Sequence, residues 1–246
     1  MRNIKAIFKK QLKGTIKSPE ILIQFIIFPL IAFLMSIIVV TDFEGVPEDI
    51  AAAITANMPN MVTMQATIFA GMGLITVIAG IVAEDIEKKS LRFLMMAGVK
   101  PGSYLLGVSG VIFFASFFTS VAFSFIGEFR GVDFWIFTGA MMSGVTGSIV
   151  LGATIGILTK NQQSASGLAL PIAIVLGFGP MMAQFNETLA RYLHIFYTQQ
   201  LNVVANYLST GGGETALWQS FAIMWANVAV LGLLFAIAYA KRGLKN

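Results

Sequence analysis

The sequence predicts an all-α, polytopic membrane protein that crosses the bilayer as six helices and forms one transmembrane domain over residues 1–246. Three observations lead to this class. Of the residues, 57% are apolar and only 11% are charged, whereas a soluble domain carries about 25% charged residues. The mean hydropathy is +0.80, and the charges are absent from long stretches of the chain. Such a chain presents its outer surface to lipid.

Six apolar stretches contain no Asp, Glu, Lys or Arg. Each is long enough to span the hydrocarbon layer, which takes about 20 helical residues. Pro171 and Pro180 interrupt the fifth stretch, which we expect to be a kinked span because neighbouring helices satisfy the backbone groups that prolines free. The predicted spans are residues 21–40, 60–83, 103–126, 134–158, 164–185 and 215–240.

The distribution of basic residues predicts the orientation. Of the 16 Lys and Arg residues, only Arg130 and Arg191 fall outside the segments 1–20, 84–102, 159–163 and 241–246. Because an excess of Lys and Arg marks cytoplasmic loops, we expect both termini in the cytoplasm. The sequence therefore predicts a multi-pass protein of a bacterial plasma membrane, in contact with its lipids.

The N-terminal segment, residues 1–18, has a helical pattern of its own. Lysines at positions 5, 9, 13 and 17 occupy one side, and Ile4, Ile7, Phe8, Leu12 and Ile16 recur on the other. This pattern is typical of a basic amphipathic helix in the membrane interface. Ser18-Pro19-Glu20 would then start the first span as N-cap, first helical residue and first-turn acid. The alternative is a basic flank that only fixes topology.

The sequence is poor in catalytic groups. It has no G-x-x-x-x-G-K-S/T phosphate-binding loop, and its single histidine and absent cysteines provide no metal cluster. We expect no enzymatic activity, no catalytic residue, and no metal or cofactor bound by this chain. Nucleic acid is not an expected partner either, because the basic residues flank the spans, where they contact lipid headgroups.

The predicted spans also lack charge at membrane depth, where proton-coupled carriers commonly place ionisable residues. A sodium-driven carrier stays open, since carbonyls and hydroxyls suffice to hold that ion. Two polar residues stand out in the spans, Gln24 and Asn227. We expect them to form interhelical hydrogen bonds, and the alternative is that they line a substrate pathway.

A stripe of small residues follows the fourth span. Its members recur every four residues and are Ala140, Gly144, Ser148, Gly152 and Gly156. Such a stripe lets a neighbouring helix approach closely. Static packing is the simpler interpretation, and sliding or rocking during a transport cycle is the alternative.

The inner loop, residues 84–102, carries the most information. Its three acids are followed by two lysines, Lys88 and Lys89, and then by a predicted short helix with Ser90 as N-cap, Gly98 just past its end and Pro101 as a stop. The helix is rich in apolar residues, with Leu91, Leu94 and Met95 on one face and Phe93 and Met96 beside them. It suits docking into a groove on a soluble partner. The alternative is a helix lying on the membrane surface.

This arrangement resembles the membrane (permease) subunits of type-2 ATP-binding-cassette exporters. The loop pattern of that family reads E-x-E-x-x-x-G-(T/S)-L-E-x-L-x-x-x-P. The residues that fit it loosely are Glu84, Glu87, Ser90, Leu91, Leu94 and Pro101. Lys89 stands where the family has glycine, and Arg92 where it has an acid.

The resemblance implies that two permease copies, identical or homologous, form a pathway lined by the first, second and fifth spans. A separate ATPase subunit would bind ATP and Mg and drive the spans through the coupling loop. The region 186–214 would form short external helices over the pathway. The coupling residues would be Glu84, Asp85, Glu87, Lys88, Ser90, Leu91, Arg92, Phe93, Leu94, Met95 and Pro101.

Two other functions remain open from the sequence. If the chain were a secondary carrier or channel, it would move its substrate by itself, without a separate ATPase. It would transport nothing if it were a membrane assembly or immunity factor. The substrate class is also open among drugs, peptides, lipids and polysaccharides.

Overall fold

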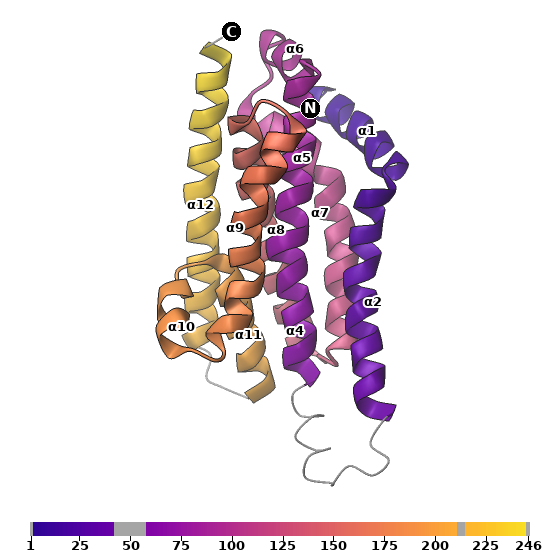
Figure 1. The fold of residues 1–246 in the computed structure, drawn as a ribbon, viewed down its shortest axis with the longest axis vertical. Coiled ribbons are helices and arrows are strands. Elements are labelled where there is room, and N and C mark those ends of the chain that lie inside the picture. The colour runs from indigo at the N-terminus through magenta and orange to yellow at the C-terminus, as the bar shows by residue number, and fades with distance from the viewer. Residues whose placement is uncertain (1, 42–57, 211–214, 245–246) are drawn as a thin grey trace.

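The computed structural model describes residues 2–41, 58–210 and 215–244, and every regular element within these ranges is helical (Figure 1). The prediction of an all-helical protein is therefore confirmed. Residues 211–214 of the predicted external loop, and residues 1, 245 and 246, lie outside the described part. In chain order the elements are α1 (Arg2–Lys17), α2 (Pro19–Thr41), α4 (Met58–Ile68), the π-helical segment η1 (Phe69–Gly73), α5 (Leu74–Glu87), α6 (Ser90–Met96), α7 (Pro101–Ile126), α8 (Val132–Leu158), α9 (Gln162–Ala183), α10 (Glu187–Leu193), α11 (Tyr197–Thr210) and α12 (Thr215–Leu244).

Five helices in the described part are long and apolar enough to cross a membrane. The count becomes six when α1 and α2, whose axes differ by 63°, are taken together as one span. The five are Asn60–Glu87, Pro101–Ile126, Val132–Leu158, Gln162–Ala183 and Leu217–Arg242. The second predicted span thus extends through the loop acids, since α5 ends only at Glu87.

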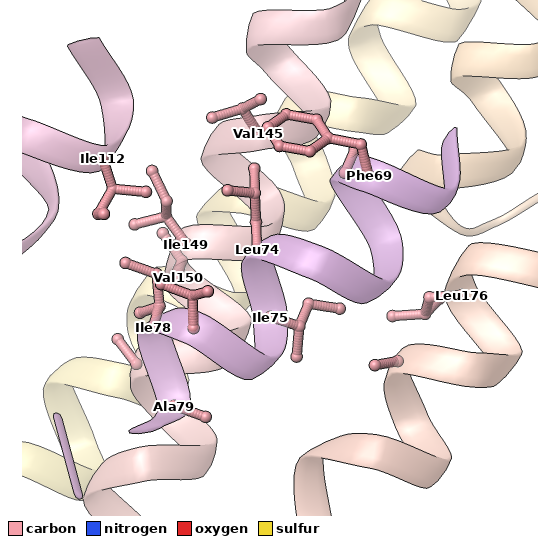
Figure 2. Close-up of a cluster of buried hydrophobic side chains, with 14 of the residues drawn as sticks. Phe69, Leu74, Ile75, Ile78, Ala79, Ile112, Val145, Ile149, Val150 and Leu176 are labelled. Atoms are coloured by element: carbon pink, nitrogen blue, oxygen red, sulfur yellow. The ribbon is translucent and has the colours of Figure 1, made fainter. Parts of the chain in front are cut away.

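The centre of the bundle is the contact between α5 and α8, where apolar side chains from both helices interlock (Figure 2). Two glycines of the small-residue stripe lie in this contact. A Cβ atom at Gly152 would lie 2.7 Å from the carbonyl oxygen of Ile75, and one at Gly156 would lie 2.7 Å from that of Ala79. Only glycine lets the two backbones approach this closely.

The π-helical segment marks a second close approach, between the α4–α5 span and α9. A Cβ atom at Gly71 would lie 2.7 Å from the backbone nitrogen of Gly177. A π-turn interrupts the regular α-helical hydrogen bonding, and the hydroxyl of Ser148 donates to the carbonyl of Ala70 within it at 2.5 Å. Ser148, a member of the small-residue stripe, therefore satisfies a backbone carbonyl of the neighbouring span.

Helix α9 passes through Pro171 and Pro180 as one continuous helix. It starts with a capping box, in which the Asn161 side chain accepts a hydrogen bond from the Ser164 backbone N–H at 2.8 Å.

Two short helices, α10 and α11, occupy the described part of the predicted external loop. Helix α11 lies beside α4 and α12 and contacts α8, α4 and α12 (Figure 1). Tyr197, at its start, is 1% exposed, and its hydroxyl is 2.9 Å from the Ser148 hydroxyl. The buried face of α11 is therefore part of the bundle core.

Candidate functional site

The short helix α6 stands at one end of the bundle, near the start of α1 and the end of α12 (Figure 1). It ends as the sequence predicted, with Gly98 in the left-handed conformation at φ +73°. The Gly98 N–H donates to the carbonyl of Met95 at 2.9 Å, and the Val99 N–H donates to that of Leu94 at 3.1 Å. These two bonds form a Schellman motif, which satisfies the last carbonyls of the helix.

The start of α6 differs from the prediction, because Ser90 is not its N-cap. Lys89 occupies that position at φ +58°, and Ser90 is the first helical residue. The left-handed turn at Lys89 bends the chain back toward α5. As a result the Ser90 hydroxyl donates to the Asp85 carboxylate at 2.6 Å.

Asp85 is the centre of a buried polar network. Its carboxylate is an ion-pair partner of the Lys10 ammonium and accepts hydrogen bonds from Ser90 and from the Tyr104 hydroxyl, the last at 3.0 Å. The Asp85 side chain is 8% exposed, and a buried carboxylate is costly unless it is paired and hydrogen-bonded. The network therefore joins α1, α5, α6 and α7 at one point.

The other loop acids are also engaged with the protein. The Glu84 carboxylate pairs with Lys88 one turn later, and this hydrogen bond and the charge of Glu84 raise the pKa of Lys88. The Glu87 carboxylate accepts from the Gln162 N–H at 3.1 Å. An acid at this position stabilises the start of α9, because a helix N-terminus carries unpaired N–H groups.

Helix α12 adds two ties to this end of the bundle. The Tyr239 hydroxyl donates to the carbonyl of Val99 at 2.9 Å, and the Arg242 guanidinium donates to that of Ile157 at 3.2 Å. Sequence reasoning missed these residues, and it missed Lys10 and Tyr104 as partners of Asp85. No local pattern marks them, because each partner lies far away in the chain or on a different helix.

The predicted docking residues divide into an inner and an outer set. Leu91 is 2% exposed and packs inward with the half-buried Leu94 and Met95, whereas Phe93 is 65% and Met96 68% exposed. The exposed apolar pair is accompanied by exposed basic residues, Lys88, Lys89, Arg92 and Lys100. A hollow of about 150 Å³ opens beside them between Lys89, Arg92 and Arg242. We call Phe93, Met96 and Arg92 the α6 tip. Pro101 is the first residue of α7 and is separated from α6 by the link 97–100.

A polar cavity of about 290 Å³ lies between α2, α5 and α9. Gln24, Thr76 and Glu84 line it, and Ser18, Gln162 and Ser166 complete its polar wall. The Oε1 atom of Gln24 is buried and has no hydrogen-bond partner within the described ranges. A buried, unpaired amide oxygen is free to bind a polar group that enters the cavity.

Asn227, the second polar residue predicted in a span, lies elsewhere. Its side-chain amide donates to the carbonyls of Ile195 and Ile223, both at 2.8 Å, so it ties α12 to the α10–α11 link. It also borders an apolar cleft of about 410 Å³ that α9 and α12 line together with Tyr197. The structure therefore places Gln24 and Asn227 in different sites.

The small-residue stripe also divides between neighbours. Gly152 and Gly156 face α5, and Ser148 joins the π-helical segment to Tyr197. A Cβ atom at Gly144 would instead lie 3.8 Å from Met224 of α12, and Ala140 is fully buried. One face of α8 thus serves three different contacts.

The five to six apolar spans define the class: this chain is a multi-pass, all-helical membrane protein. No protein-family model and no curated protein matches the sequence. Within residues 2–41, 58–210 and 215–244, no three His, Asp or Glu side chains are grouped so that they could hold a metal ion.

Proposed function

We propose that this protein is the transmembrane subunit of an ATP-driven exporter of the type-2 ATP-binding-cassette class. In this proposal two permease copies enclose the pathway, and a separate ATPase subunit docks on the α6 tip at the cytoplasmic face. The observation that carries the proposal is the construction of α6. It is a short helix outside the spans that is fixed from within by Asp85 and exposes Phe93 and Met96.

A helix that transmits force has to be rigidly attached to what it moves. Through Asp85, α6 is bonded to α1, α5 and α7, and through Val99 the following link is bonded to α12. A displacement of α6 would therefore reach four other helices directly. The exposed apolar pair with its basic neighbours suits a groove that is apolar inside and acidic at its rim.

The backbone at position 89 gives independent support to the family resemblance. Lys89 has φ +58°, a conformation that favours glycine. The loop pattern of type-2 exporters has glycine at this position. The departure from the family pattern thus changes the side chain, while the conformation that glycine favours is retained.

The polar cavity between α2, α5 and α9 supports the pathway part of the proposal. These helices correspond to the first, second and fifth predicted spans, which the resemblance assigns to the pathway. Gln24 of α2 and Glu84 of α5 would both line the space that the substrate enters. The close contact of Gly71 with α9 would set how far α9 can move against α5.

The test is recruitment of the ATPase. The chain is co-expressed with the ATP-binding-cassette ATPases encoded in the same genome, and copurification is measured for wild type and for the double variant Phe93→Ala, Met96→Ala. We expect the double variant to lose the ATPase, because it removes the exposed apolar contact. The control is Phe114→Ala with Leu106→Ala on α7, since these residues are also about 60% exposed but lie outside α6.

Unchanged recruitment by the double variant would reject α6 as the docking site. The variant Lys89→Gly tests the correspondence with the family glycine more specifically. If position 89 corresponds to the family glycine, this variant keeps both recruitment and ATP-dependent transport. Loss of both in Lys89→Gly would contradict the correspondence.

A self-contained carrier is the second candidate, and the position of Glu84 favours it. This carboxylate lines the polar cavity, as a coupling residue in a carrier would. Reconstitution of the chain alone in liposomes without ATP distinguishes the two functions. Transport that is abolished by Glu84→Gln under these conditions would replace the exporter proposal by a carrier.

A further inference from the structure

The turn between α7 and α8 forms an open pocket of about 610 Å³. It lies at the end of α7 that is remote from α6, where two predicted membrane spans, Pro101–Ile126 and Val132–Leu158, meet. Four aromatic residues line the pocket together with Glu128 and Arg130, and they are Phe125, Phe129, Phe134 and Trp135. None of these residues takes part in the function proposed above.

The aromatic rings of the pocket are arranged edge to face. The ring centres of Phe125 and Phe134 are 4.9 Å apart, and those of Phe134 and Trp135 are 5.2 Å apart, with interplanar angles of 64° and 81°. Phe125 is 70% and Trp135 64% exposed. Most of the surface of these two rings is therefore exposed, and the face of an aromatic ring attracts a cation such as an ammonium group.

Both charged residues of the pocket are available to a ligand. The side chains of Glu128 and Arg130 are exposed, and within the described residues neither forms an ion pair or a hydrogen bond. Their opposite charges stand two positions apart in the sequence and line the same pocket. A carboxylate pairs with an ammonium group, and a guanidinium pairs with a phosphate in a bidentate manner.

The backbone holds Glu128 in an unusual conformation. Its φ is +56°, in the left-handed region. The Glu128 N–H donates to the carbonyl of Phe125, and the Phe129 N–H donates to that of Ser124, both at 3.2 Å. This is the Schellman position that glycine normally fills. A glutamate at a left-handed position beside a pocket is a reason to look for a function of its side chain.

From these observations we propose that the α7–α8 turn binds the headgroup of a membrane phospholipid that carries both an ammonium group and a phosphate. The ammonium group lies against the aromatic rings and pairs with Glu128, while the phosphate pairs with Arg130. The position of the pocket at the ends of two spans identifies the source as the bilayer, since headgroups and Trp side chains occupy the same interfacial layer. This site does not depend on the exporter function.

The experiment measures lipid affinity through Trp135. Trp218 and Trp225 are replaced by Phe, so that Trp135 is the sole tryptophan of the three in the chain. Phosphatidylethanolamine or the anionic lipid phosphatidylglycerol is titrated into the purified protein in detergent, and the Trp135 emission is recorded. We expect phosphatidylethanolamine to bind tighter by about threefold or more, as an exposed cation–π contact with an added charge pair predicts.

Three variants make the result specific. Glu128→Gln removes the charge and should abolish the preference for phosphatidylethanolamine. Glu128→Gly should do the same while relieving the backbone strain, so a folding defect cannot explain the loss. Asp133→Asn is the matched control, because Asp133 is a nearby exposed acid in the first turn of α8 that does not line the pocket, and it should keep the preference.

Equal affinity of wild type for the two lipids would overturn the proposal. The same follows if Glu128→Gln and Asp133→Asn change the preference equally, since the effect would then be one of general charge. Glycerophosphoethanolamine, the soluble headgroup, is titrated in parallel. If it bound as tightly as the lipid, the assignment to a membrane lipid would be wrong.

Discussion

Helices α6 and α7 end in the same hydrogen-bond pattern, yet the two ends of the bundle to which they belong are built differently. In both helices a left-handed residue follows the last turn, and it is Gly98 after α6 and Glu128 after α7. At the α6 end, side chains from α1, α6 and α7 converge on Asp85 of α5, and Tyr239 of α12 bonds to the carbonyl of Val99 next to Gly98. Around Glu128, the turn is closed mainly by neighbours in the sequence, such as Phe129, whose ring stacks on Phe137.

This difference fits the separate roles proposed for the two ends. Contacts between distant helices make the α6 end one mechanical unit, as force transmission requires. A turn closed by local contacts leaves its charged side chains without protein partners, as ligand binding requires. The following predictions test this comparison, from the largest expected effect to the smallest.

The largest effect is expected from the close helix contact near the α6 end. Gly156→Val would place new atoms against the Ala79 carbonyl and the Val82 side chain, both at 2.7 Å from a Cβ atom. We expect a loss of about 3 kcal/mol in the free energy of unfolding, because overpacking forces the backbones apart. Gly139→Val, toward the other end of the same helix, is the control, since a Cβ atom there meets nothing within 4 Å. Detergent unfolding curves that are equally shifted by both variants would contradict the packing described above.

Removing Asp85, the centre of the buried polar network, should have the next largest effect on the free energy of unfolding. Asp85→Ala leaves the buried Tyr104 hydroxyl without its acceptor and Lys10 without its partner. We expect a loss of about 2.5 kcal/mol, since unpaired buried polar groups keep their desolvation cost. Asp133→Ala removes an exposed acid from the first turn of α8 and should cost only about 0.5 kcal/mol, the usual contribution of an exposed acid at a helix N-terminus. Thermal unfolding in detergent measures both, and equal effects would remove the distinction between the two ends.

A single hydrogen bond of the network can be tested separately. Tyr104→Phe removes the hydroxyl that donates to Asp85 at 3.0 Å and leaves the ring in place. We expect a loss of about 1.5 kcal/mol, the usual range for a hydrogen bond to a charged group. Tyr192→Phe serves as the control, because Tyr192 is 72% exposed and should be neutral. If Tyr104→Phe is also neutral in the same unfolding assay, the bond adds nothing to the attachment of α7.

The smallest effect, and the most direct test, is a reciprocal exchange at the two left-handed positions. Gly98→Glu should destabilise the protein by about 1 kcal/mol, and Glu128→Gly should stabilise it by a similar amount, because left-handed backbone is unfavourable for residues with a Cβ atom. Both positions have room, since nothing lies within 4 Å of a Cβ at Gly98 and Glu128 is exposed. If both variants shift the melting temperature in the same direction, backbone conformation alone does not determine how these two positions affect stability.

Several features of the fold followed from the sequence. The charge-free stretches predicted the apolar helices, because about 20 apolar residues in a row leave the chain little choice in a bilayer. Gly98 correctly predicted the end of α6, since its backbone preference acts locally. Pro101 was expected only as a stop, and in the structure it is also the first residue of α7, two residues before the predicted third span. The spacing of Gly152 and Gly156 identified a close helix contact but not the neighbour that makes it.

Tertiary structure decided the rest. In the sequence, the loop acids Asp85 and Glu87 were expected among the coupling residues, whereas the structure bonds them to Tyr104 and to the start of α9. Lys89, a poor choice for a left-handed position, replaced the expected cap at Ser90. The reason is common to these cases: local patterns set the helices through backbone preference and hydrophobicity. The partner of a buried polar group depends on which distant helix lies against it, and only the folded bundle brings Lys10, Asp85 and Tyr104 together.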